Sequence, residues 1–152
     1  MNTIKLKNYT STVSAITSMA RIQEALVQAG ATDISMKYVD KSCTAVTFRM
    51  ELPGGIFMFF KLPAKVQPCF DVLWKEVKRP RSDTKKTIQT QAERTAWKIV
   101  ADWVEIQLSM ILLKQAEPLQ VFLSYKYNPE TDKTFYEQIK ESNFNLLLPS
   151  SK

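Results

Sequence analysis

The ionisable side chains of this sequence exclude several kinds of chemistry. The chain has 152 residues, no histidine and two cysteines, Cys43 and Cys69. Without histidine it lacks the commonest general base and metal ligand, and it has no partner that could activate a serine or cysteine nucleophile. Two cysteines alone also provide too few soft ligands for a structural zinc site. We therefore expect a protein that is not an enzyme, with no catalytic residues, no metal, no cofactor and two free thiols.

One pair of carboxylates has a spacing that could support metal binding or acid–base chemistry. Asp102 and Glu105 are three residues apart on a helical pattern, so they meet on one face, and Asp71 could join them. Lys98 lies one turn before Asp102 and offers an ordinary ion pair worth about 0.3–0.5 kcal/mol. We favour the ion pair.

The first candidate binding surface combines basic and aromatic side chains in alternating sequence. If the strand patterns pair as predicted, one sheet face carries Phe57 and Phe59 beside five basic residues: Lys5, Lys7, Lys37, Arg49 and Lys61. Basic groups attract phosphates, and flat rings can stack nucleic-acid bases at about 1–3 kcal/mol each. The alternative is that the two rings are covered by another segment or a second subunit.

The second candidate surface is a basic connector, which we define as residues 75–86. Its cations are Lys75, Lys78, Arg79, Arg81, Lys85 and Lys86, and its carboxylates are Glu76 and Asp83. The chain as a whole has a formal net charge of +6. Such a segment can follow a phosphate backbone, or it can be a solvated loop.

Periodicity in the sequence predicts the elements that position these residues. In chain order they are a short strand at 4–9, a helix at 17–29, strands at 34–38, 46–52 and 56–62, a short helix at 69–78, a long helix at 92–117 and a short helix at 134–141. Between the last two helices, residues 119–127 fit either an alternating strand or, as we favour, a short helix followed by extended chain. Ser82 or Asp83 could cap the long helix, which would then begin near Thr84. Its apolar arc of about 180° predicts that other elements wrap most of it.

This order, β-α-β-β-β-α-α-α, predicts an α+β fold. A three- to four-stranded antiparallel meander would have helices packed on one face. Residues 1–145 would form a single domain, and 146–152 a frayed C-terminal tail. Hydrophobic residues make up 45% of the chain and charged residues 24%, and no run of 18 apolar residues occurs. We expect no membrane span, no secretory signal and a cytoplasmic location.

Several segments resemble a family of small uncharacterised proteins encoded by prophages and other bacterial mobile elements. They are NYTST, SMARIQEALVQAGA, AVTFRM, FKLP, AERTAWKIVADWVEIQLSMI and LQVFLSYKY, of which AWKIVADWVE is the most specific. The sequence departs from the family in the short turn at 128–133, where relatives often carry glycine. The resemblance implies a bacteriophage or mobile-element context in a bacterial host cell. It assigns no catalytic motif or functional residue.

Two functions follow as expectations. The first is a non-enzymatic accessory protein that binds single-stranded DNA or RNA. It would do so through the outer sheet face or through Lys78, Arg79, Arg81, Lys85 and Lys86 of the basic connector. The second is a module that docks on a phage or host protein and inhibits or modulates a defence or replication enzyme. Apolar surface on the long helix and at Phe57 and Phe59 also leaves a homodimer open.

Overall fold

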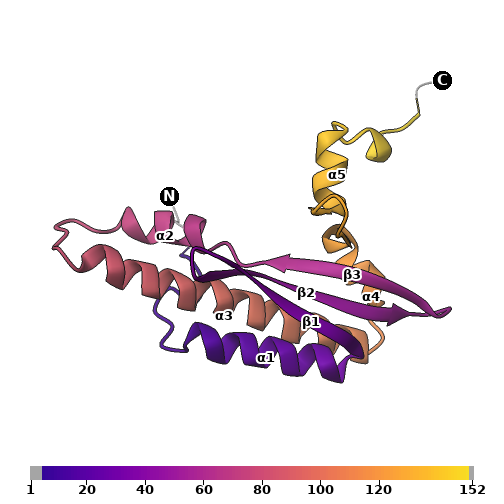
Figure 1. Ribbon diagram of the computed structural model, residues 1–152, viewed down its shortest axis with the longest axis horizontal. Helices are drawn as coiled ribbons and strands as arrows, with labels where there is room; N and C mark the ends of the chain where they lie inside the picture. Colours follow the sequence, from indigo (N-terminus) through magenta and orange to yellow (C-terminus); the bar gives the residue numbers. More distant parts are fainter. Residues whose placement is uncertain (1–4, 151–152) are drawn as a thin grey trace.

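The computed structural model describes residues 5–150. Its elements are α1 (Ala15–Gln28), β1 (Ala31–Val39), β2 (Ser42–Leu52), β3 (Ile56–Pro63), α2 (Val66–Trp74), α3 (Thr84–Leu112), α4 (Pro118–Phe122), η1 (Leu123–Tyr125), β4 (Tyr127–Asn128), β5 (Lys133–Thr134), α5 (Phe135–Glu141) and η2 (Asn145–Leu147). The predicted α+β class is confirmed (Figure 1).

The main sheet is an antiparallel meander in the order β1-β2-β3. Its alternation follows the sequence pattern, because Val46, Phe48, Met50 and Leu52 of β2 are all buried. The β2–β3 turn contains Gly54 and Gly55 at φ +92° and +74°, a conformation that side-chain-bearing residues rarely adopt. This turn fixes the register that places alternate β3 side chains on opposite faces.

Helices α1 and α3 lie side by side against one face of this sheet (Figure 1). Their core contacts include Ile22 and Leu26 of α1 and Val104 of α3, which are fully buried. Trp97 of α3 is also fully buried, and its indole Nε1 donates a hydrogen bond to the Cys43 carbonyl at 3.1 Å. That bond ties the long helix to β2.

The C-terminal part of the chain closes one end of the core and then leaves it. Pro118 is the first residue of α4, and Phe122 packs edge-on against Phe48 at 5.3 Å between ring centroids. The predicted change from helix to extended chain over 119–127 is confirmed. β4 and β5 then form a small hairpin, and α5 projects away from the sheet and the long helices (Figure 1).

The expected first strand is not present in the described residues. Residues 5–10 contain no strand, and Asn8 sits in a turn at φ +61°. Leu6, the expected strand residue that the structure describes, is half-buried against the core, while Ile4 lies outside the described residues. Two apolar positions were too little periodicity to distinguish a strand from an irregular segment.

The expected extent and covering of the long helix are also wrong. α3 begins at Thr84, as expected, with Asp83 at the N-cap position but without the expected side-chain capping bond, and it ends at Leu112, well before Pro118. Lys114 has a φ of +60°; its N–H donates to Ile111, and the N–H of Gln115 donates to Met110, which together form a Schellman end. Other elements do not cover the whole C-terminal half of α3, because Ile106 is 58% and Leu113 is 68% exposed.

Within the described part of the chain, no helix combines the length and the apolar character that crossing a bilayer requires.

Candidate nucleic-acid interface

Strand β3 presents two aromatic rings on the face of the sheet that α1 and α3 leave open. Phe57 and Phe59 are 44% and 40% exposed, whereas Phe60, the next residue of β3, points to the opposite face and is fully buried. The predicted direction of these rings, away from the helical layer, is confirmed. We call this surface, with Arg49 and the side chains around it, the outer sheet face.

Arg49 reaches across the outer sheet face from β2. Its guanidinium lies 4.0 Å from the centroid of the Phe57 ring, and its Nη1 is 3.4 Å from Asp33 Oδ2. The geometry is that of a cation–π contact combined with an ion pair. One side of the Phe57 ring is therefore already occupied, and the cation nearest the rings already has a carboxylate.

The β4–β5 hairpin supplies a carboxylate to the other two cations of this face. Asp132 lies 3.5 Å from Lys37 Nζ and 3.4 Å from Lys61 Nζ, and it accepts a hydrogen bond from the Tyr127 hydroxyl at 2.5 Å. Lys61 Nζ also lies 5.2 Å from the centroid of the Tyr127 ring. Sequence reasoning identified Asp132 only as a turn residue, because no local pattern links it to a lysine 95 residues away.

This cluster changes the titration of its own members. The hydrogen bond from Tyr127, followed by the charges of Lys61 and Lys37, lowers the pKa of Asp132 below its ordinary value. The same bond raises the pKa of Tyr127, because the neutral phenol is the donor. Asp33 pairs with Arg49, Asp132 pairs with Lys37 and Lys61, and Glu51 lies opposite Phe57 in the strand register. The outer sheet face is therefore aromatic and balanced in charge.

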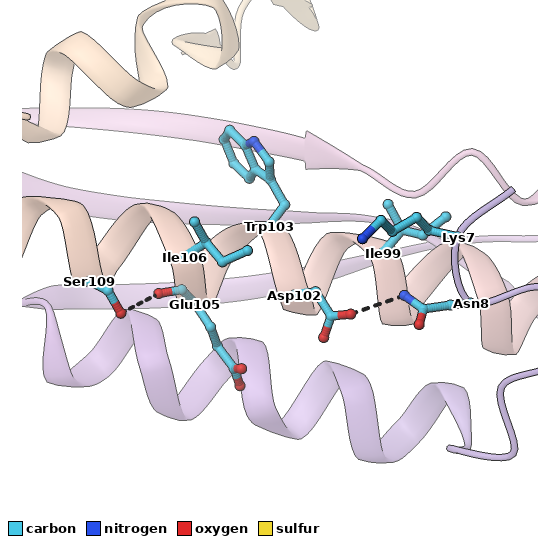
Figure 2. A pocket seen from close by; sticks show the side chains of 8 residues that line it. All are labelled: Lys7, Asn8, Ile99, Asp102, Trp103, Glu105, Ile106 and Ser109. Atoms are coloured by element: carbon cyan, nitrogen blue, oxygen red, sulfur yellow. Dashed lines mark hydrogen bonds between the residues drawn. The ribbon is translucent and has the colours of Figure 1, made fainter. Parts of the chain in front are cut away.

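Lys5 and Lys7 do not belong to this face, which corrects the sequence expectation. Both are exposed in the irregular segment before α1. Lys7 instead borders a groove along α3, where the neighbouring Asn8 Nδ2 donates to Asp102 Oδ2 at 3.0 Å (Figure 2). The expectation failed because it required a strand that residues 5–10 do not form.

The basic connector joins α2 to α3 at the end of the molecule opposite the β2–β3 turn (Figure 1). The stacked rings of Phe70 and Trp74, 5.7 Å apart, anchor the end of α2. On the other side, the Arg81 N–H donates to Thr84 Oγ1 at 2.8 Å, which ties the loop to the start of α3. The connector and the rings of the outer sheet face therefore do not form one continuous site.

All six cations of the basic connector are exposed: Lys75, Lys78, Arg79, Arg81, Lys85 and Lys86. Within residues 5–150, none of them forms an ion pair. Lys85 and Lys86 also lie in the first turn of α3, which contains no acidic residue, and Asp83 makes no capping bond there. The free N–H groups and dipole of a helix start attract anions, so they add to the charge of these side chains.

The carboxylates Asp102 and Glu105 form a structural ion-pair cluster. Arg21 of α1 donates to both oxygens of Glu105, at 3.0 and 2.6 Å, and Lys98 Nζ lies 2.6 Å from Asp102. Burial works to raise the pKa of Asp102, but hydrogen bonds from Lys98 and Asn8 and the charges of Lys98 and Arg21 lower it overall. The favoured Lys98–Asp102 pair is confirmed, and sequence reasoning missed its partner Arg21.

The remaining candidate ligands are dispersed. Asp71 accepts a hydrogen bond from Gln67 on α2 and does not join Asp102. Cys43 and Cys69 are free and buried, and burial raises the pKa of both thiols. Residues 5–150 contain no group of three or more histidine, cysteine or acidic side chains that could hold a metal ion.

No protein-family model, curated protein or solved structure matches this chain.

Proposed function

We propose that this chain binds single-stranded DNA or RNA and that the basic connector makes the principal phosphate contacts. The observation that carries this proposal is a protruding segment with six exposed cations that form no ion pairs within residues 5–150. Four of the six net positive charges of the chain belong to this segment, which has six cations and two carboxylates. Lysine and arginine that neutralise phosphates release counterions, which favours binding at low salt.

The connector supports contacts to phosphates more than contacts to base edges. It is a loop that leads into a helix start, and phosphate contacts of this kind carry no sequence information. The exposed ring of Phe59 offers a secondary surface on which an unpaired base could stack. We therefore infer a preference for single strands with little dependence on base sequence.

The biological context of the proposal comes from the sequence resemblance. On that basis we infer an accessory protein of a bacterial virus or integrated element that acts in the host cytoplasm and catalyses no reaction. The absence of histidine from the sequence supports the non-enzymatic part of this inference.

Fluorescence anisotropy with labelled single-stranded DNA and RNA tests the proposal. We expect saturable binding at about 50 mM salt and a linear fall of log affinity with log salt concentration. If neither nucleic acid binds at that salt concentration, the proposal is overturned.

The outer sheet face supports a second candidate function, a module that docks on a phage or host protein. Its rings are exposed and its charges are balanced, which suits a protein surface better than a polyanion. The test is a pull-down after nuclease treatment. Stoichiometric recovery of one protein, lost when Phe59→Glu alters this face, would favour docking; recovery unchanged by that substitution would exclude the outer sheet face as the site.

A further inference from the structure

Strand β1 forms one edge of the main sheet, and within residues 5–150 no other strand pairs with that edge. The opposite edge differs, because Phe60 of β3 forms a β-bridge with Lys126 of the C-terminal segment. In the described part of the chain, no backbone hydrogen bond other than those to β2 reaches β1. The nine residues of β1 therefore present a row of unpaired N–H and C=O groups, with which another extended chain can pair.

The regular part of β1 runs from Asp33 to Lys37. The register with β2 shifts immediately before and immediately after this segment. The Lys37 carbonyl faces β2, because Thr44 Oγ1 donates to it at 3.4 Å. Since the direction of the backbone groups alternates along a strand in an antiparallel pair, the N–H and C=O groups of Ile34 and Met36 point to the free edge.

This regular segment is complementary to itself when it is reversed. Its residues are acidic, apolar, polar, apolar and basic in turn: Asp33, Ile34, Ser35, Met36 and Lys37. An antiparallel copy centred on Ser35 would place Asp33 opposite Lys37 of that copy. Opposite charges that face each other across an antiparallel pair stabilise it, whereas like charges destabilise it. The charges of β1 therefore favour one particular occupant of the free edge, a second β1.

We propose that β1 pairs with β1 of a second copy of this chain, antiparallel and centred on Ser35, so that two three-stranded sheets become one. The backbone groups match in this register, because Ile34 lies opposite Met36 of the second copy and both direct their groups to the free edge. A shift by one residue would set core-facing side chains opposite those of the outer sheet face, so the register is specified. The twofold axis at Ser35 makes the contact closed.

The ion pairs already present on the outer sheet face extend into this contact. Asp33 lies 3.4 Å from Arg49, and Lys37 lies 3.5 Å from Asp132. The side chains of Asp33 and Lys37 are still 63% and 46% exposed, so each can accept a second partner. In the joined sheets, Asp33 would lie between Arg49 and Lys37 of the second copy. The charges would then alternate in sign across the joined face.

Helix α1 offers exposed apolar side chains near the same edge. Ile16 and Val27 are 78% and 60% exposed. On a helical wheel they lie roughly opposite Arg21, which pairs with Glu105 of α3, so they face away from α3. Because α1 packs next to β1, the two side chains would approach α1 of the second copy once the strands pair. The strand contact is thus accompanied by an apolar one.

Sedimentation equilibrium of the full chain, without nucleic acid, tests this pairing independently of the proposed function. At about 100 µM, where a complex of micromolar affinity is largely formed, the wild type should have twice the mass of 17.5 kDa. Asp33→Lys sets like charges opposite each other, and so does Lys37→Asp, so each variant alone should associate about tenfold more weakly or worse. An equimolar mixture of the two variants restores opposite charges at both positions and should recover the doubled mass.

Glu51→Lys is the matched control, because Glu51 is exposed on β2 and does not lie on the free edge. This variant should remain a dimer, and circular dichroism checks that every variant folds. Amide hydrogen exchange gives a second measurement: the N–H groups of Ile34 and Met36 should become protected as the wild-type concentration rises. A monomeric wild type, or a mixture of variants that stays monomeric, overturns the proposal. A dimer in which these two amides exchange freely would also overturn it, because the contact would then lie elsewhere.

Discussion

The guanidinium of Arg49 lies 4.0 Å from the centroid of the Phe57 ring while it pairs with Asp33. This relationship decides how the outer sheet face can act. A base that stacked on that side of Phe57 would have to displace an arginine that already has both a ring and a carboxylate. A cluster of six cations without ion pairs in the described residues lies at the opposite end of the molecule, in the basic connector.

Phe57→Ala should therefore change the affinity for single-stranded nucleic acid by less than twofold. Stacking on an available ring is worth about 1–3 kcal/mol, and one side of this ring is not available. Anisotropy at constant salt measures the effect, with Phe59→Ala as the comparison because its ring has no such contact with Arg49. A loss of tenfold or more for Phe57→Ala would show that bases displace the guanidinium.

Trp97→Phe should destabilise the fold by about 1–3 kcal/mol, because it leaves the buried Cys43 carbonyl without its donor at 3.1 Å. Urea unfolding followed by circular dichroism measures the change. The control is Trp74→Phe, at a half-buried ring that stacks on Phe70. Equal losses for the two variants would argue against a specific role for the indole hydrogen bond.

Two fully buried hydroxyl groups should respond oppositely to removal. Ser18 Oγ has no hydrogen-bond partner, so Ser18→Ala should leave stability unchanged or raise it by up to about 1 kcal/mol. Thr95 Oγ1 donates to the Asn8 carbonyl at 2.9 Å, so Thr95→Val should cost about 1–3 kcal/mol. Chemical denaturation of both variants provides the comparison. If Ser18→Ala lost as much stability as Thr95→Val, the predicted difference between the two hydroxyl groups would be contradicted.

Asp132 should make the hairpin packing depend on acidic pH. Its pKa is lowered in the folded chain by Tyr127, Lys61 and Lys37, so its contribution to stability is present above the unfolded value of about 3.9. That contribution is lost as the pH falls through the lower, folded-state value. A carbon NMR titration should find Asp132 below its ordinary range, and Tyr127→Phe should raise its pKa. An ordinary pKa in the wild type would rule out this cluster.

Sequence periodicity was sufficient to predict the antiparallel meander and the direction in which the β3 side chains point. The alternation from Val46 to Leu52 and the Gly54–Gly55 turn determine the strand pairing and the side-chain direction. The alternation and the turn are local features, so the sequence reveals them. Local patterns could not reveal that Asp132 pairs with Lys37 and Lys61, since these contacts join residues far apart in the chain. The charge of the outer sheet face was therefore overestimated from sequence.

The predictions of the length of α3 and of how much of its surface is covered were wrong for related reasons. An apolar arc on a helical wheel indicates which side chains require burial, but it does not identify which element provides it. α2 lies beside the N-terminal half of α3, where Ala92 and Ala96 are buried, and it does not extend to Ile106 (Figure 1). The Schellman end at Lys114 was missed because a lysine at φ +60° has no signal comparable to glycine or proline.

The most direct test of the proposed function compares two double variants that remove the same charge from different places. Lys78→Gln with Lys86→Gln removes two cations of the basic connector, and Lys126→Gln with Lys140→Gln removes two exposed lysines elsewhere. In anisotropy titrations against salt, the connector variant should weaken single-strand binding and reduce the slope of log affinity by about 1.4, which is the effect of two lost phosphate contacts. The control variant should keep the wild-type slope. Equal slopes for the two variants would contradict a phosphate site at the basic connector.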